Sequence, residues 1–438
     1  MIEAIKNIFK IPELRDRVLF TFAMLVIVRF GAFVVTPGVN SEVLAAAMQN
    51  QGGLSQLYDL FTGGAFSQAA VFSCGIMPYI SASIILQLLG TAVPYFQRLQ
   101  KEGEEGRRKI GQYTRYGTLV IAGLQASGIA LFLNSNPGGM AVTDGSVFFI
   151  VMTVITMSAG TMLLLWIGEQ ITDNGIGNGV SLIIFINIIA RLPISIQQEI
   201  GNIAGNQQQV VYEFVALIFA VLIIAAVVAL TQGTRKIPVQ YAKRVVGKKV
   251  YGGTSAFFPI KVNAAGVMPI IFAQAFMFLP EMIFKLFPNN EFINESLAPM
   301  FAYDHWFYWF VTFIFIVFFT YFYTAIAMNP QEIADNLKKQ NGFVPGIRPG
   351  KSTADYIDAV LTRLTLPGSI FLGLISTVPY FLVTGLNLTF GYANFFGGTG
   401  LLIVVGVALD TLQHLESHLA MRNYDGFLKT GRLKGRRA

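Results

Sequence analysis

Few residues in this 438-residue chain carry groups that could perform covalent or metal chemistry. Two imidazoles, His414 and His418, stand four residues apart in the sequence HLESH and would share one face of a helix. The pattern is neither HExxH nor HxxEH and no third ligand is evident, so we interpret it as a polar helix end. The glycine-rich run 175–179 differs from a phosphate loop because no strand precedes it, and it predicts a tight turn.

Ionisable residues are also sparse within the apolar runs of the chain. Arg29 lies in the middle of a run, and Asp410 is the one acid well inside the last run. Glu169 and Asp173 stand where another run ends. Proton- or ion-coupled transporters usually bury acids or histidines in their spans, so these sparse charges argue against a proton relay. We expect Arg29 to pair with an acid or to extend to the membrane surface.

The elements that must position these groups are membrane spans. The chain is 54% apolar and only 13% charged, whereas soluble proteins carry about 25% charged residues. Its single cysteine, Cys74, excludes an internal disulfide framework. Residues 1–17 have helical periodicity and predict a segment along the membrane surface. Ten apolar runs predict ten spans, at 18–35, 75–89, 114–133, 147–167, 180–192, 210–231, 264–287, 306–328, 366–386 and 401–419.

The distribution of basic residues predicts the orientation of these spans. One set of alternate loops holds 28 of the 31 Lys and Arg residues, and only Arg29, Arg191 and Lys285 fall outside it. By the positive-inside rule, both termini are cytoplasmic. Neither Lys nor Arg occurs in the opposite loops 36–73, 134–146 and 387–398.

The stretch from Leu54 to Leu89 predicts a broken membrane segment. Leu54, Leu57, Tyr58 and Phe61 recur at helical spacing before Gly63 and Gly64 interrupt the helix. The apolar run 75–89 that follows would rise only about 22 Å as a helix, against a hydrocarbon core of about 30 Å. Non-helical backbone at membrane depth is tolerated only inside protein or beside water, so this stretch is a candidate functional site.

Ten spans predict an all-α polytopic membrane protein that divides at the polar loop 201–209 into two halves. The N-terminal half is 1–205 and the C-terminal half is 206–438. Five spans each would insert the halves with opposite topology, which is the arrangement of an inverted repeat around a functional path.

Two cytoplasmic loops carry the charge that could bind a partner. The loop 232–263 has seven basic residues and no acid, and alternating basic and apolar residues around 241–251 suggest a hairpin. One interpretation is a topology determinant that contacts anionic lipid; the other is docking of RNA or an acidic protein. In the second loop, about 329–365, prolines and glycines predict a turn that presents Arg348.

Seven blocks of the sequence, in order along nearly the whole chain, resemble the SecY family, the channel subunit of the bacterial protein-export translocon. They are GIMPYISASIILQLL, KEGEEGRRKIGQYTRYGTLV, GEQITDNGIGNG, KVNAAGVMP, NPQEIADNLKKQNGFVPGIRPG, TRLTLPG and FGGTGLLIVVGVALD. The resemblance implies two inverted five-helix halves around an hourglass pore in the bacterial plasma membrane. It implies a channel that passes unfolded polypeptides and releases transmembrane segments sideways through a lateral gate, between spans two and three on one side and seven and eight on the other.

The resemblance also assigns site residues, whereas spacing alone fits lipid-facing or packing roles for the isoleucines. The positions that match the family's pore ring are Ile80, Ile84, Ile184, Ile188, Ile271 and Ile403. The half-helix at about 54–66 matches the plug, with Leu57, Tyr58, Leu60, Phe61, Gly63, Gly64 and Phe66. The residues expected to dock the SecA motor ATPase or the ribosome are Lys236, Lys243, Arg244, Lys248, Lys249 and Arg348.

The resemblance implies SecE-like and SecG-like membrane subunits, signal sequences and translocating polypeptides as further partners. We expect no cofactor and no enzymatic activity, because the chain has no P-loop and no residue set for covalent chemistry. An alternative function is a secondary transporter of small solutes, which would share inverted repeats and broken helices but needs coupling-ion ligands that the sequence lacks. An intramembrane enzyme would need a paired acid, a Ser-His set or a full metal site.

Overall fold

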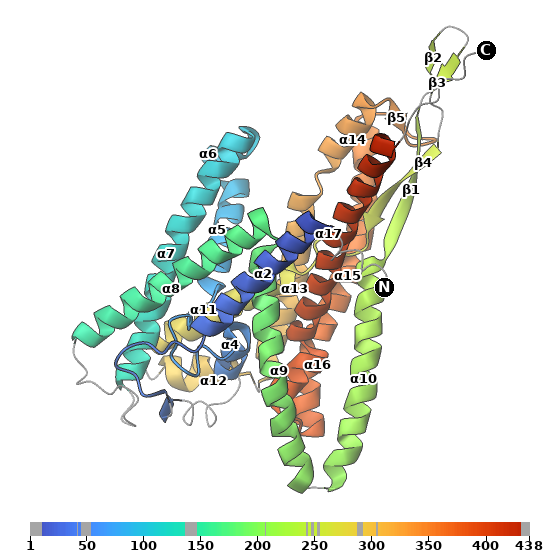
Figure 1. The fold of residues 1–438 in the computed structure, drawn as a ribbon. Helices are drawn as coiled ribbons and strands as arrows, with labels where there is room; N and C mark the ends of the chain where they lie inside the picture. The colour runs from blue at the N-terminus through green and yellow to red at the C-terminus, as the bar shows by residue number, and fades with distance from the viewer. Residues whose placement is uncertain are drawn as a thin grey trace. The chain divides into compact units, whose positions relative to one another are not determined.

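The computed structural model describes most of the chain and leaves several short segments aside. The described residues are 11–41, 43–44, 54–135, 147–205, 207–241, 244–246, 249–251, 255–286, 292–303 and 305–430. The helices and strands among them form two compact units, one from residues 1–194 and 407–438 and the other from 195–406. Figure 1 shows the helices and strands that make up the two units.

The first unit is helical. In it α7 packs against α5, α6 and α8, and α2 packs against α8. Residues on both sides of α4 contribute to its core, which includes Phe66, Cys74 and Met157. The helices of this unit are α2 (Pro12–Gly31), α4 (Leu54–Thr62), α5 (Met77–Ala92), α6 (Pro94–Lys101), α7 (Glu104–Ser135), α8 (Val147–Asn174), and the larger parts of α9 (Gly179–Gly205) and α17 (Thr399–Thr430).

The second unit combines membrane helices with two small antiparallel sheets. Its helix α13 packs against α11 and α15, and α15 also packs against α10, α14 and α16. The helices are α10 (Gln207–Gln232), α11 (Met268–Leu286), the π-helix η1 (Phe292–Leu297), α12 (Ala298–Met300), α13 (Trp306–Ala327), α14 (Pro330–Lys339), α15 (Lys351–Leu386) and α16 (Phe390–Gly397). The strands are β1 (Thr234–Tyr241), β2 (Arg244–Val246), β3 (Lys249–Tyr251), β4 (Ser255–Lys261) and β5 (Gly342–Phe343), in a β4-β1-β5 sheet and a β2-β3 hairpin.

Each of the ten predicted apolar runs falls on a helix, although not every helix is an unambiguous span. Among the described residues, seven helices are long and apolar enough to cross a membrane, and α5 with α6 makes an eighth, bent by 97° at the break between them. The two other runs fall on α2 and α11. Charged residues at the start of α2 lower its mean hydropathy, and the apolar part of α11 is short, at 268–278. Ten spans therefore remain a prediction.

The predicted loops are wrong in extent, because helices continue past the apolar runs. Most of the stretch between the predicted spans 75–89 and 114–133 is α6 and the start of α7, and α15 begins at Lys351, fifteen residues before its apolar run. The predicted loop 201–209 is largely helical, since α9 runs to Gly205 and α10 starts at Gln207. A helix satisfies its own backbone hydrogen bonds in water as well as in lipid, so hydropathy marks only the membrane-embedded part.

The start of the chain also differs from the prediction. Residues 12–17, which were assigned to the surface segment, form the first turns of α2, while residues 1–10 lie outside the described ranges. Pro12 stands at the first helical position, where its missing N–H costs nothing. The helix ends at Gly31, four residues before the end of the predicted span 18–35. Beyond the helix, Val35 pairs with Ala70 in an isolated β-bridge.

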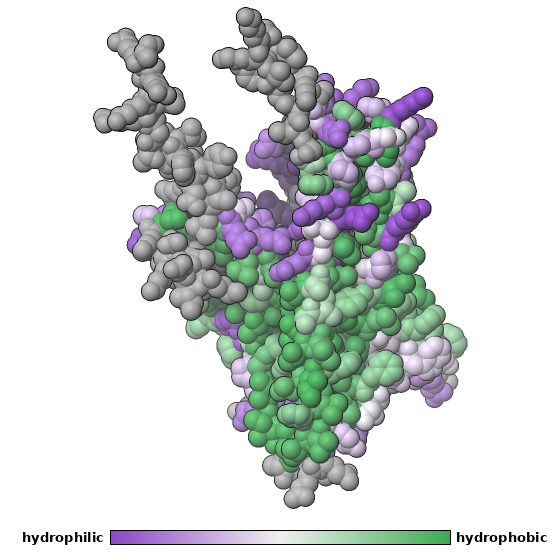
Figure 2. Space-filling model, turned by 90° about the vertical axis from the view of Figure 1, so that its right-hand side faces the viewer, coloured by the Kyte–Doolittle hydropathy of each residue, from purple (hydrophilic) through white to green (hydrophobic). Residues whose placement is uncertain are grey.

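The surface of the second unit separates apolar from polar side chains. Large apolar residues of α10 are exposed, among them Phe214, Leu217 and Leu222. Figure 2 shows this apolar surface on one face of the molecule, with hydrophilic side chains gathered toward one end. Exposed apolar area of this kind is what lipid chains cover in a membrane protein.

Candidate functional site

The predicted plug is a short amphipathic helix, as its spacing predicts. Leu57, Leu60 and Phe61 of α4 are buried, and so is Phe66 just beyond the helix. The Tyr58 ring meets the Phe66 ring edge to face at 4.9 Å, and its hydroxyl donates to the Cys74 carbonyl at 3.1 Å. The apolar positions of the predicted plug therefore form part of the core of the first unit.

The glycine pair ends α4 as predicted, and its geometry explains why glycine is needed. Gly63 and Gly64 have φ of 66° and 95°, in the left-handed region that favours glycine. A Cβ on Gly63 would lie 2.6 Å from Nη1 of Arg29 and 2.8 Å from Oδ1 of Asn187. A Cβ on Gly64 would lie 3.0 Å from Cζ of Arg191. Three polar side chains thus approach the backbone of this turn.

The segment that follows the turn is tied to the plug by hydrogen bonds within it. The Ser67 amide donates to Oδ1 of Asp59 at 2.8 Å, and the Ser73 hydroxyl donates to the Ala65 carbonyl at 2.9 Å. Beyond it, residues 69–71 pair with residues 34–36, through amide-to-carbonyl bonds of 2.8 and 2.9 Å. The predicted plug and the residues up to Ser73 therefore form one hydrogen-bonded network next to the end of α2.

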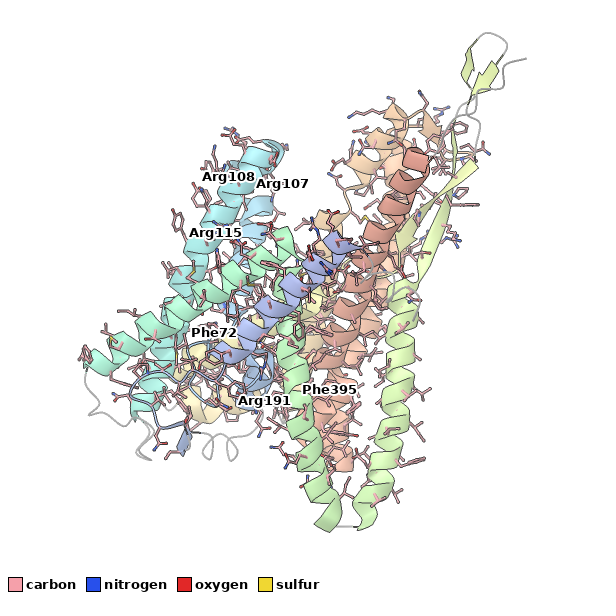
Figure 3. All side chains as sticks on the ribbon, in the orientation of Figure 1. Phe72, Arg107, Arg108, Arg115, Arg191 and Phe395 are labelled. Atoms are coloured by element: carbon pink, nitrogen blue, oxygen red, sulfur yellow. The ribbon has the colours of Figure 1, made fainter. Side chains whose placement is uncertain are left out.

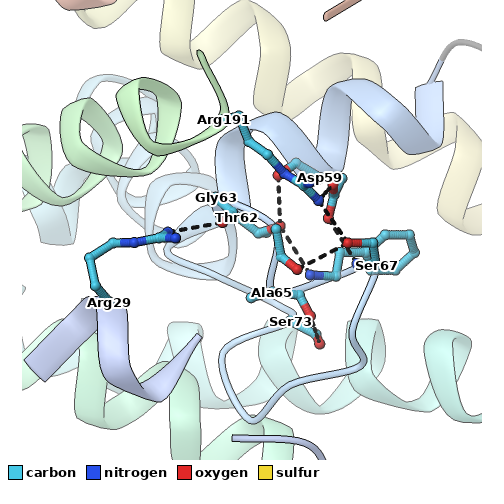
Figure 4. A network of polar contacts seen from close by, with 10 residues as sticks. Arg29, Asp59, Thr62, Gly63, Ala65, Ser67, Ser73 and Arg191 are labelled. Atoms are coloured by element: carbon cyan, nitrogen blue, oxygen red, sulfur yellow. Dashed lines mark hydrogen bonds and ion pairs between the residues drawn. The ribbon is translucent and has the colours of Figure 1, made fainter. Parts of the chain in front are cut away.

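Polar side chains of two other helices, α2 and α9, contact this hydrogen-bonded network (Figure 4). Arg191 of α9 forms an ion pair with Oδ2 of Asp59 and donates to the Ser67 hydroxyl at 2.7 Å. The side chains of Arg191 and Asp59 are only 19% and 15% exposed. Such a shielded, multiply bonded pair is costly to break, because each charge would lose its partner in a poorly hydrated place.

The C-terminal carbonyls of α4 receive two further donors. Arg29 of α2 donates to the Gly63 carbonyl at 2.9 Å, and its guanidinium lies 5.5 Å from the centre of the Phe33 ring. Asn187 of α9 donates to the Phe61 carbonyl at 3.2 Å. The last carbonyls of a helix lack partners within the helix and carry its negative dipole end, so a cation there is favourable.

The sequence pointed to only part of this contact set. Arg29 was expected to pair with an acid, whereas it donates to a backbone carbonyl, and the acid of the region, Asp59, pairs with Arg191. No role was assigned to Asp59, Asn187 or Arg191. The available signal was the charge distribution, because Arg29 and Arg191 are two of the three basic residues outside the cytoplasmic loops.

The six isoleucines assigned to the pore ring are all buried, at 4% exposure or less. In the first unit, Ile80 and Ile84 lie on α5, and Ile184 and Ile188 lie on α9. In the second unit, Ile271 lies on α11 and Ile403 lies on α17. Burial excludes the lipid-facing interpretation for these side chains, and their role as a ring remains a prediction.

The predicted docking residues lie on and around a small domain of the second unit. Its core is apolar: Ile237 and Val239 of β1 and Ile260 of β4 pack with residues of α14 and α15. Lys236 is on the exposed face of β1, and Arg348 is exposed in the turn before α15, where its carbonyl accepts a 2.9 Å hydrogen bond from the Thr353 hydroxyl. The turn around Arg348 is as predicted.

The hairpin suggested by the basic loop is also present. Val245 of β2 pairs with Val250 of β3, and this pairing places Arg244 and Lys249 on the two strands of the hairpin. Lys243 and Lys248 lie outside the described residues. A docking role for these six basic positions remains a prediction.

The other candidate groups have structural surroundings. Residues 175–178 form the turn between α8 and α9, and Gly179 begins α9. Nε and Nη2 of Arg115 donate to the two carboxylate oxygens of Glu169, each at 2.9 Å. Figure 3 shows Arg115 further along α7 than the exposed Arg107 and Arg108. His414 lies 3.9 Å from Asp410. Within the described part of the chain there is no group of three or more His, Cys, Asp or Glu residues that could hold a metal.

Comparison with known proteins settles the family. A family model described as SecY matches residues 70–412, which is most of the chain. The chain belongs to the SecY family. Its relatives include proteins named protein translocase subunit SecY from Thermotoga maritima, 43% identical over 445 residues, and from Thermus thermophilus, 44% identical over 440 residues. In both cases the similarity covers 100% of this chain and 100% of the relative.

Solved structures share the SecY fold at lower identity. One titled "The structure of a protein conducting channel" has a TM-score of 0.65 at 17% identity, and Sec61 in a canine ribosome-channel complex has 0.62 at 17%. A third, on the plug domain of SecY and the closed state of the translocation channel, has 0.58 at 17%. Each covers 98% of this chain and 99% of the other. The all-α fold class is thereby confirmed.

Proposed function

We propose that this chain is the channel-forming subunit of a protein translocase, and that it passes unfolded secretory polypeptides across the plasma membrane. The observation that carries the proposal is full-length similarity to relatives named as SecY translocase subunits, at 43% identity and above. Long apolar helices support a multi-pass membrane location. The basic-residue pattern supports cytoplasmic termini.

The idle channel would be sealed by apolar side chains. A ring of Ile80, Ile84, Ile184, Ile188, Ile271 and Ile403 would make a constriction that water wets poorly, which raises the barrier for ions. Isoleucine offers no specific hydrogen bond, so the same ring can close around many different translocating sequences. The burial of all six side chains supports this assignment.

The plug would add a second barrier when the channel is idle. Its segment contains a helix too short to span a membrane, nine residues long, followed by a glycine turn that three polar side chains approach. A lateral gate, between spans two and three and spans seven and eight, would release sufficiently apolar segments into lipid. The transfer free energy that defines a membrane span drives this step.

Energy and substrate would come from partners. The exposed basic residues around the small domain, including Lys236 and Arg348, would dock the SecA motor ATPase or the ribosome through electrostatic complementarity. SecE-like and SecG-like subunits would complete the membrane complex. We assign no enzymatic step to this chain, because its side chains offer a path and a seal rather than a reacting group.

Reconstitution tests the proposal. The chain would be purified with its native partner subunits, placed in liposomes and supplied with SecA, ATP and a precursor protein, and translocation would be measured by protease protection. We expect protection that depends on ATP and on the signal sequence, and co-purification of a single-span SecE-like subunit. Ion-gradient-driven uptake of a small solute, with no precursor protected, would instead support the transporter alternative.

A further inference from the structure

We propose that Arg191 is a latch that couples widening of the pore ring to release of the plug. The proposal rests on the proposed function, since it assigns a positioning role within the same channel. Three observations lead to it: the bonds that Arg191 makes, the helix on which it stands, and the arrangement of charge around the plug turn.

Arg191 joins the plug to α9 at two points. Its guanidinium pairs with Oδ2 of Asp59, inside the plug helix, and donates at 2.7 Å to Ser67, beyond the glycine turn. The two oxygens of Asp59 have separate tasks, because Oδ1 accepts the Ser67 amide within the segment. Removal of Arg191 would therefore break these two links between the plug and α9 and leave the plug's own bonds intact.

The helix that carries this latch also carries two residues of the proposed ring. Ile184, Ile188 and Arg191 follow one another at steps of four and three, so they share one face of α9. Seven residues rise about 10 Å, which places the latch two turns from Ile184. Asn187, 5% exposed, adds a second contact to the plug from the same stretch. Displacement of this helix that widens the ring thus pulls on Asp59 and Phe61.

The charges make the docked plug the favoured state. Arg29 and Arg191 approach adjacent residues of one turn, Gly63 and Gly64, from two different helices. In the docked state one cation binds the Asp59 carboxylate and the other binds a helix C-terminal carbonyl. When the plug leaves, both cations lose these partners, so the vacated site attracts the plug back after each translocation event.

Two uncharged variants test the latch with intact complexes in liposomes. Arg191→Gln removes the cation, and Asp59→Asn removes the charge but keeps an oxygen for the Ser67 amide. We expect each to raise iodide influx through the idle channel at least about tenfold, since hydrogen bonds to charged groups contribute that much or more. The double variant should leak no more than Arg191→Gln alone. Arg115→Gln, which breaks a bidentate ion pair with Glu169 elsewhere in the first unit, should leave influx unchanged.

The chain's single cysteine reports the position of the plug. Cys74 is 0% exposed, and its carbonyl accepts the hydroxyl of Tyr58 in the plug helix. In the wild type we expect slow reaction with a maleimide, accelerated by a synthetic signal peptide that opens the channel. In Arg191→Gln the reaction should be fast with or without the peptide.

The outcomes separate the latch from the channel. Unchanged influx in Arg191→Gln, or an equal rise in Arg115→Gln, would overturn the latch. Raised influx with slow Cys74 labelling would overturn it as well, because the ring would then have loosened with the plug in place. Either result leaves the proposed function standing as long as the wild type still translocates a precursor, whereas failure of the wild type to do so would overturn the function itself.

Discussion

Substitution of one glycine tests whether the plug docks in the geometry described. We predict that Gly63→Ala releases the plug and makes the idle channel leak ions. Gly63 has φ of 66°, and a new Cβ would lie 2.6 Å from Nη1 of Arg29 and 2.9 Å from Cα of Asn187. Because the released plug need not hold this φ or this approach, the substitution penalises the docked state alone.

The magnitude follows from two terms. The left-handed conformation costs a non-glycine residue about 1–2 kcal/mol. Forcing a methyl group into a filled space costs about 1–3 kcal/mol more. The equilibrium between docked and released plug should therefore shift by about 2–5 kcal/mol, which is a factor of about 30 or more. The backbone of Asn187 cannot move aside without moving α9, so we do not expect relaxation to remove the clash.

Iodide influx into liposomes that contain the purified complex measures the ion leak. In cells, export of a precursor with a defective signal sequence measures release of the plug. Gly103→Ala is the matched control. Gly103 has φ of 73° in the turn between α6 and α7, and a Cβ there would meet no atom within 4 Å. It should lower the stability of the complex by about 1–2 kcal/mol without a leak. Equal influx in both variants and the wild type would refute the docked geometry.

The ring, the docking surface and the small domain can each be tested by single substitutions. Ile84→Asn should raise ion leak and relax signal-sequence stringency because it wets the ring, whereas Ile85→Asn, at a neighbouring position that is 42% exposed, should do neither. Arg348→Glu should block motor- or ribosome-dependent export in a vesicle assay. Lys351→Glu is the control, because it changes the net charge by the same amount. An equal loss of export in Lys351→Glu would show that net charge rather than Arg348 matters. Ile237→Ala should destabilise the small domain by about 2–5 kcal/mol and weaken SecA binding in a sedimentation assay, with no increase in ion leak.

Sequence periodicity predicted the membrane elements because each signal is local. Each of the ten apolar runs marked a position at which a helix lies, and the pair Gly63-Gly64 marked the end of α4. Helix length was underestimated wherever charged residues continue a span into water, as in the first turns of α7 and α15. Hydropathy reports the solvent around a residue, whereas the helix depends on hydrogen bonds that are independent of that solvent.

The contacts that hold α4 and the turn after it could not be predicted in the same way. Asp59 and Arg191 are far apart in the chain, and nothing in one sequence states that they meet. The resemblance to a known family assigned the isoleucines and the plug, but it assigned no role to the arginines. What the sequence did offer was an energetic anomaly, since a basic residue within a span needs a partner and Arg29 and Arg191 are such residues.

The length of α15 has a mechanical consequence. Its 36 residues run from the turn beside Arg348 to Leu386, about 54 Å of continuous helix. The hydroxyl of Thr353, in its first turn, ties the helix to the Arg348 carbonyl. A protein that binds and displaces that turn therefore also displaces the N-terminal end of α15, and the rigid helix transmits this movement to its apolar C-terminal part in the membrane. Pro367 and Pro379 each remove a backbone hydrogen bond within α15, so the helix bends most easily at these two positions when its end is displaced.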